Sequence, residues 1–137
     1  MKKGIVFTVL TSLFCIFFLT GCIESSTEKG KIRDLEYTVV CEDNLPEELQ
    51  KGIKERKAKE FKISYSDGNF LYICRGYGEQ ETGGYSIRVT DLYLSEDGIV
   101  FATEFIGPDK SENVPQVSSY PVITVKTEII DKPLIFE

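Results

Sequence analysis

Side chains that could carry out chemistry are few in this chain, which has four cysteines and no histidine. The absence of histidine excludes Ser-His-Asp and Cys-His nucleophilic catalysis and the usual zinc sites. The 22 aspartates and glutamates show no spacing that singles out a pair for acid–base catalysis. We therefore expect no catalytic residue, no metal site and no cofactor, which leaves the cysteines as the residues to consider first.

Two of the cysteines, Cys41 and Cys74, each end a short apolar run, Val39-Val40 and Tyr72-Ile73. This pattern predicts that both lie in strands of the core, close together only if those strands pair. Two interpretations remain open. They are two small buried hydrophobic side chains, or they form a disulfide, which an extracellular compartment permits. A metal site is not expected, because two cysteines alone lack further ligands.

Residues 1–21 have the features of a secretory signal, with two lysines before an almost wholly apolar run from Gly4 to Leu19. The run ends in Leu19-Thr20-Gly21, and Cys22 follows. This ending resembles the lipobox of bacterial lipoproteins, in which the leader is removed and the cysteine is diacylated. The alternative is a transmembrane anchor, but the run is shorter than the ~20 residues of a spanning helix. We predict a signal peptide over 1–21, lipidation at Cys22, and a location in the bacterial cell envelope on the extracytoplasmic side.

Removal of residues 1–21 would leave 116 of the 137 residues, enough for one small domain. With the two leader lysines gone, 14 basic and 22 acidic residues remain, a net charge of −8. An acidic surface argues against nucleic acid as a partner and against adsorption to anionic lipid. Membrane contact is therefore expected through the acyl chains on Cys22, each buried methylene contributing roughly 0.8 kcal/mol.

Residues 22–34 are polar and without periodicity, and we interpret them as a lipidated tether before a globular domain over 35–137. A helix is predicted after Pro46, because Leu45, Leu49 and Ile53 form an apolar stripe at helical spacing. Alternating apolar and polar residues predict strands over 35–41, 61–65, 69–77, 85–94, 99–106 and 122–125, with a short edge strand over 134–136.

Asp67-Gly68 and Asp97-Gly98 are tight hairpin signals, and the alternation slips by one residue at Asp91, which indicates a β-bulge. The predicted class is α+β and mostly β, with six or seven mainly antiparallel strands. One helix cannot cover both faces of such a sheet, so we expect a sandwich or a partial barrel.

The segment from Gly76 to Tyr85 contains four glycines between two predicted strands. Glycine is favoured where φ is positive or where the backbone approaches another group closely, and we expect positive φ at Gly83 and Gly84. One interpretation is a structurally demanding crossover. The other is a preformed loop that binds a protein partner, with contact residues Gln80, Thr82, Gly83, Gly84 and Tyr85.

This part of the sequence resembles a known family. Thr82-Gly83-Gly84-Tyr85-Ser86-Ile87, then a hairpin, a proline-bearing connection, Tyr120-Pro121 and the apolar residues 122–125, is similar to the PrcB C-terminal domain. The resemblance covers residues 80–137. Glu81 stands where many relatives are expected to have proline, which makes the loop less rigid. The family takes its name from a lipoprotein subunit of a surface protease complex, so the resemblance implies a non-catalytic accessory protein with an exported protease as partner.

The same Thr82–Tyr85 loop is also similar to a loop of chagasin-like cysteine-protease inhibitors, β-sandwiches that wedge such a loop into an active cleft. Only this stretch matches, and the chain has no tryptophan for the other inhibitor loops. The expected function is a lipid-anchored binding protein and not an enzyme, with a small protease inhibitor as the alternative.

Overall fold

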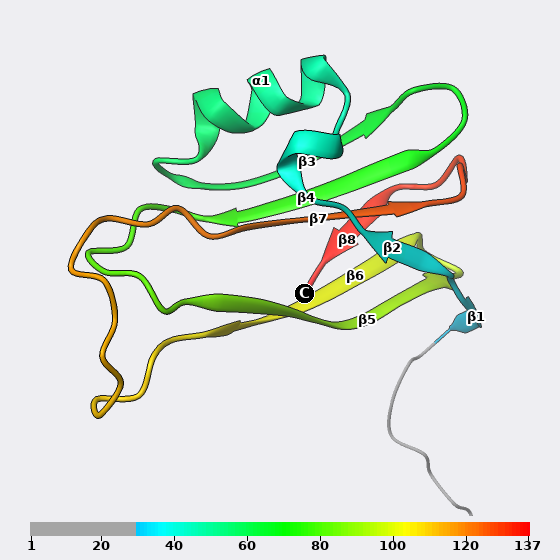
Figure 1. Ribbon diagram of the computed structural model, residues 1–137. Coiled ribbons are helices and arrows are strands. Elements are labelled where there is room, and N and C mark those ends of the chain that lie inside the picture. Colours follow the sequence, from blue (N-terminus) through cyan, green and yellow to red (C-terminus); the bar gives the residue numbers. More distant parts are fainter. Residues whose placement is uncertain (1–29) are drawn as a thin grey trace, which may run out of the picture.

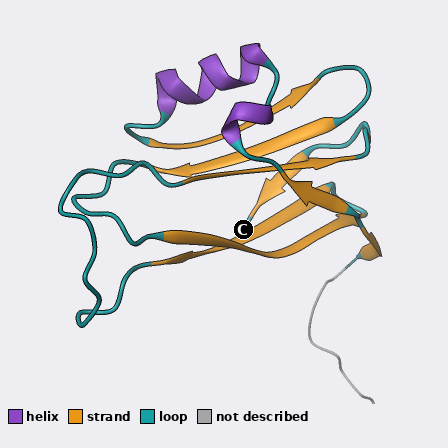
Figure 2. Cartoon of the chain, in the orientation of Figure 1, coloured by secondary structure: helices purple, strands orange, loops and turns teal. Residues whose placement is uncertain are grey.

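Two four-stranded β-sheets face each other, and one helix covers the outer face of the second sheet (Figures 1 and 2). The structure is a computed structural model, and it describes residues 30–137. The predicted signal peptide, the lipidation site Cys22 and the tether as far as residue 29 lie outside the described residues. No helix within residues 30–137 is long and apolar enough to cross a membrane.

The first sheet has the strand order β1-β5-β6-β8, and the second has the order β2-β7-β4-β3. All strand pairs are antiparallel except β6 and β8. The strands are β1 (Lys31–Asp34), β2 (Tyr37–Val39), β3 (Glu60–Ser66), β4 (Leu71–Tyr77), β5 (Ser86–Ser95), β6 (Ile99–Ile106), β7 (Val122–Thr127) and β8 (Leu134–Phe136). The helices are the short 3-10 helix η1 (Glu42–Asn44) and α1 (Glu47–Arg56). The prediction of a mostly β, α+β sandwich is confirmed.

The main hydrophobic core lies between the two sheets. Alternate residues of each strand point inward, as the period of two in the sequence predicts. Phe101 and Val125, from opposite sheets, are both fully buried. The other buried members of this core are Leu35, Ile73, Leu92, Ile99 and Ile123.

A second core lies between α1 and the outer face of the second sheet. The predicted stripe of Leu45, Leu49 and Ile53 is buried there, against side chains of β3 and β4. Pro46 is the N-cap residue of α1, where its missing N–H costs no helical hydrogen bond. The Phe61 ring lies over Gly76 on the paired strand, in space that a side chain at position 76 would occupy.

The start of the domain differs from the prediction. We expected one strand over 35–41 and a tether through residue 34, but the chain forms β1 and β2 in different sheets. Leu35 lies between them, is only 4% exposed, and donates its backbone N–H to the carbonyl oxygen of Leu92 at 3.0 Å. The buried Leu35 side chain anchors the chain in the core where it crosses from the first sheet to the second. Residues 30–137 therefore form eight strands and not the expected six or seven, and residues 31–34 pair within the first sheet.

The predicted hairpins and the predicted β-bulge are confirmed. The hairpin between β3 and β4 has Gly68 at φ +90°, and Asp67 Oδ1 accepts the backbone N–H groups of Asn69 and Phe70 at 2.8 and 2.7 Å. Asp97-Gly98 connects β5 to β6. The register of that pair shifts between Val89 and Asp91, where the alternation slips.

Candidate functional site

The glycine loop after β4 and the long connection after β6 meet at one end of the sandwich, the left end in Figure 1, away from Gly30. Gln80 and Ser119 form an antiparallel bridge, each donating its N–H to the other's carbonyl oxygen at 2.8 and 3.0 Å. The Gly83 N–H donates to the Pro115 carbonyl at 2.9 Å, and the Ser119 hydroxyl donates to the Thr82 carbonyl at 2.7 Å. The connection thus braces the loop, and we call the two together the loop end (residues 78–85 and 107–121).

The two central glycines have different roles. Gly84 has φ +88°, as predicted, and a Cβ there would lie 2.5 Å from Val114 Cγ1. Gly83 is not at positive φ, so that prediction is wrong. A Cβ at Gly83 would lie 3.2 Å from Cδ of Pro115, so close packing against the connection is what favours glycine at this position.

Tyr85 is partly buried, and its ring packs within the domain. Its ring stacks on Phe105 with centroids 5.2 Å apart, and Phe105 stacks in turn on Tyr77 at 4.4 Å. The Tyr77 hydroxyl lies 2.6 Å from Thr103 Oγ1, within hydrogen-bond distance. This stack joins both sheets beneath the loop end, so Tyr85 positions the loop.

Gln80 and Thr82 are partly buried, and their side chains bond within the loop. The Gln80 amide donates to the Tyr77 carbonyl at 3.2 Å, and the Thr82 hydroxyl donates to the Gly83 carbonyl at 3.1 Å. The structure therefore brings all five predicted contact residues together, but most of their polar groups hold the loop in shape.

The exposed apolar groups at the loop end come from the ends of the connection. Val117 is 65% exposed, and Ile106 and Tyr120 are each 38% exposed. The Tyr120 hydroxyl donates to Glu79 at 3.3 Å, and the Lys57 ammonium lies 4.8 Å from the centre of its ring. Sequence reasoning missed these residues, although the stretch 114–125 has no charged residue in a chain that is 28% charged.

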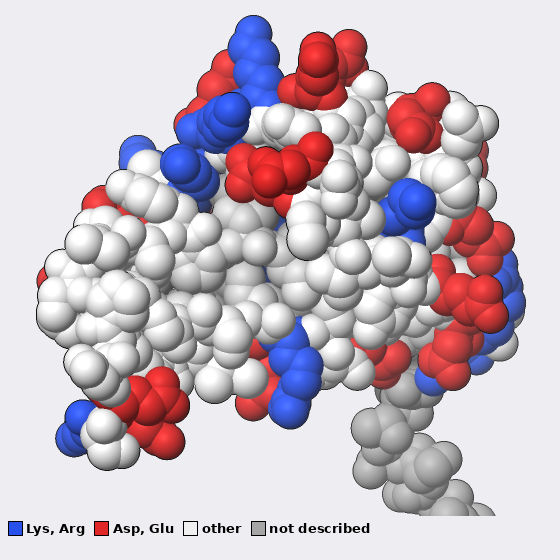
Figure 3. Space-filling model, in the orientation of Figure 1, with Lys and Arg blue, Asp and Glu red and all other residues white. Residues whose placement is uncertain are grey.

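Charge is distributed unevenly over the molecule. Figure 3 shows white surface over most of the left end, where the loops lie, with one group of acidic and basic residues at its lower corner, whereas such groups are crowded at the opposite end. The centres of protein interfaces are depleted of charged residues and enriched in aromatic ones. Residues 114–121 of the connection are uncharged, are hydrogen-bonded to the glycine loop and expose Val117 and Tyr120, so this part of the loop end has the composition of a protein-binding surface. The charged residues of the loop end lie outside this stretch: Glu79, Glu81, Asp109, Lys110 and Glu112.

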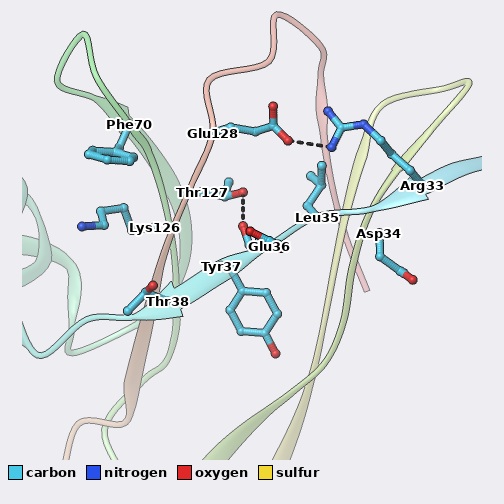
Figure 4. Close-up of a pocket in the computed structure, with 10 residues that line it drawn as sticks. All are labelled: Arg33, Asp34, Leu35, Glu36, Tyr37, Thr38, Phe70, Lys126, Thr127 and Glu128. Carbon is cyan, nitrogen blue, oxygen red and sulfur yellow. Dashed lines mark hydrogen bonds and ion pairs between the residues drawn. The ribbon is translucent and has the colours of Figure 1, made fainter.

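A hollow of about 940 Å³ lies at the opposite end, between the β1–β2 crossing and the end of β7 (Figure 4). Arg33 and Glu128 form an ion pair across it at 2.6 Å, and this hydrogen bond lowers the pKa of the Glu128 carboxyl. The Lys126 ammonium lies 4.5 Å from the centre of the Phe70 ring. Since charges of both signs line this hollow and contact groups of its own walls, it does not specify a ligand.

The two cysteines of the domain lie in different environments. Cys74 is fully buried in β4, with Sγ 3.0 Å from Thr124 Oγ1, and burial raises the pKa of its thiol to about 11. Cys41 is exposed between β2 and η1, so the prediction that both lie in core strands is wrong for Cys41. Both thiols are free in the structure. Strand β7 lies between β2 and β4, so these two strands do not pair, whereas a disulfide between Cys41 and Cys74 was expected only if their strands paired. Residues 30–137 contain no cluster of acidic or cysteine side chains that could hold a metal ion.

Comparison with known proteins identifies the central part of the chain. Residues 71–128 match the family model described as PrcB C-terminal, and over this range the chain is a PrcB C-terminal domain. The family prediction is confirmed, although the match begins before residue 80 and ends before residue 137. It runs from β4 to just beyond β7 and includes the whole loop end. No curated protein and no solved structure matches the chain.

Proposed function

We propose that this protein is a lipid-anchored accessory protein of the cell envelope that binds another exported protein through its loop end. The observation that carries the proposal is the exposure of Val117 and Tyr120 in a stretch, residues 114–125, that has no charged residue, supported by a loop that is hydrogen-bonded to its neighbour. A loop held in shape before binding loses less conformational entropy when a partner docks.

The position of the loop end supports binding away from the membrane. The first described strand, β1, lies at the end of the sandwich opposite the loops (Figure 1). If Cys22 carries the lipid, only seven residues separate it from Gly30 in the sequence. The domain would then stand close to the membrane with its loop end directed outward.

An exported protease is the partner class that we propose, because the family is named for a lipoprotein subunit of a surface protease complex. The inhibitor alternative receives less support from the geometry. A wedge loop needs free backbone groups at its tip, but the Gly83 N–H and the Thr82 carbonyl already bond within the domain. An accessory role in assembly fits a braced loop better than insertion into a cleft.

The binding proposal is tested by cross-linking in intact cells, followed by mass spectrometry of the captured proteins. Val117→Asp places a charge in the centre of the loop end and should abolish cross-links to the exported partner. Ile129→Asp is a matched control, because Ile129 is also exposed, at 46%, and follows β7 at the other end of the domain. Equal recovery of the partner with wild type and Val117→Asp would exclude the loop end, and loss with both variants would mean that the surface is not specific.

The anchor is tested separately by metabolic labelling with a fatty acid. Wild type should take up the label, and Cys22→Ala should lose it and accumulate as uncleaved precursor. Label retained in Cys22→Ala would contradict lipidation at this residue.

A further inference from the structure

Strand β5 has an edge that is only partly covered. On one side, β6 pairs with β5 from Ser86 to Leu94. On the other side, β1 pairs only with Tyr93–Ser95, and the Leu35 N–H reaches Leu92. Because the chain crosses to the second sheet at Leu35, no strand within residues 30–137 pairs with residues 86–90 on that side.

A groove of about 250 Å³ lies beside this open edge, between the two sheets. Its walls are mainly apolar and include Val39 of β2, which is 57% exposed, together with Ile87 and Ile123. Ile87 and Val89 are partly buried on the inner side of β5, so an added strand would place alternate side chains over the same groove.

The outer side of the open edge carries one cation. Arg88 is 65% exposed in its side chain and forms an ion pair with Glu104 on β6. On the side of β5 away from β6, no strand within residues 30–137 places a residue beside Arg88. Opposite charges on neighbouring strands stabilise pairing, so an acidic residue is the most favourable neighbour on an added strand.

We propose that the open edge of β5 binds an extended segment of the partner protein as an additional strand. The segment has aliphatic residues at alternate positions, facing the groove, and an acidic residue beside Arg88. This inference rests on the proposed partner binding, and it specifies that the partner contacts the domain through a strand added to β5. The groove includes Tyr85 and Pro121, so the edge is continuous with the loop end.

A second copy of this chain is a less favourable occupant of the edge. Antiparallel pairing of two β5 strands would point their Gly30 ends in opposite directions, which works against two lipid anchors in one membrane. Self-association through β5 is therefore an outcome that the experiment must distinguish.

The probe is a blocked synthetic peptide of about seven residues, the length of an ordinary strand. It has valine at alternate positions, glutamate at the centre and threonine elsewhere. Amide hydrogen exchange of the full-length lipidated protein in detergent micelles should show protection within residues 86–90 when the peptide is present. A second peptide, N-methylated at alternate amides, keeps the side chains but loses main-chain donors, and should bind at least about tenfold more weakly.

Charge reversal supplies an independent readout. Arg88→Glu should weaken binding of the glutamate peptide by roughly threefold to tenfold and should favour the same peptide with central lysine. Lys54→Glu, an equal change of charge on α1, should leave both affinities unchanged. Absence of protection, or equal binding of the N-methylated peptide, would overturn the inference.

Protection of the same amides without peptide, together with concentration-dependent association in sedimentation, would show that a second copy occupies the edge and would also overturn it. If the peptide does not bind but Val117→Asp still abolishes cross-linking to the partner, the added strand alone is refuted. If the peptide binds but cross-linking to the partner is unchanged in Val117→Asp, the loop-end site is refuted instead.

Discussion

Replacing Gly84 by alanine tests whether the loop end is a braced structure or a loose loop. Two costs are expected. An L-residue at positive φ is destabilised by about 1–2 kcal/mol, and Gly84 has φ +88°. The added methyl would also lie 2.5 Å from Val114 Cγ1, and overpacking of this kind costs about 1–3 kcal/mol. Together they predict a loss of about 2–5 kcal/mol in the free energy of unfolding.

Gly68 provides a matched control. It has φ +90°, but a Cβ there would meet nothing within 4 Å. Gly68→Ala should therefore show the backbone cost alone, about 1–2 kcal/mol. The difference between the two variants isolates the packing cost at position 84, where a Cβ would meet Val114 and also Pro108 Cβ at 3.0 Å.

Urea unfolding of the two variants measures both costs as shifts of the midpoint at unchanged slope. Adding Val114→Ala to Gly84→Ala should recover part of the packing cost but none of the backbone cost. The reasoning is refuted if Gly84→Ala is no more destabilising than Gly68→Ala, or if the Val114→Ala background gives no recovery.

Three further predictions concern the domain away from the loop end. Gly76→Ala should destabilise by about 1–3 kcal/mol in urea unfolding because its methyl meets the Phe61 ring, and an unchanged midpoint would contradict this packing. Iodoacetamide at pH 8, read by peptide mapping, should label exposed Cys41 in the native protein and Cys74 only after unfolding, whereas a disulfide would leave both unlabelled. Two backbone N–H bonds lower the pKa of Asp67, so its contribution to stability is complete above the ordinary carboxyl pKa of about 3.9 and is lost as pH falls through the lowered value. The difference in urea midpoint between wild type and Asp67→Ala should therefore shrink below about pH 4, and a difference that stays constant under acid would count against it.

Features that depend on neighbouring residues could be predicted from the sequence. The Asp-Gly hairpins, the bulge near Asp91 and the helix after Pro46 each follow from turn chemistry or periodicity over a few positions. The division of β1 from β2 could not be predicted, because it depends on which distant strand each pairs with. Leu35 looked like one apolar residue in an alternating run, and only its hydrogen bond to Leu92 shows that the chain changes sheets there.

The candidate site was predicted in position but not in the roles of its residues. The glycine-rich composition correctly located a constrained loop, but Tyr85 proved to be an internal stacking residue and Gly83 a packing position. These roles are set by Phe105, twenty residues after Tyr85, and by Pro115, thirty-two residues after Gly83. Exposure of Val117 likewise depends on how the connection folds back on the loop, so the proposed binding surface can be identified only in the three-dimensional structure.

The loop end and the open edge of β5 share one structural support. Tyr85 lines the groove beside β5, and its ring belongs to the stack with Phe105 and Tyr77 beneath the loops. A partner strand on β5 would therefore lead directly to the surface around Val117. Since one rigid element would position both contacts, Val117→Asp and Arg88→Glu should each weaken the same complex. In a double variant, the loss in binding free energy should be no larger than the sum of the two separate losses, because Val117 and Arg88 lie in separate contacts and neither is one of the three stacked rings. Phe105→Leu should disturb both contacts at once by loosening Tyr85, whereas an effect on only one of them would show that the two surfaces are held independently.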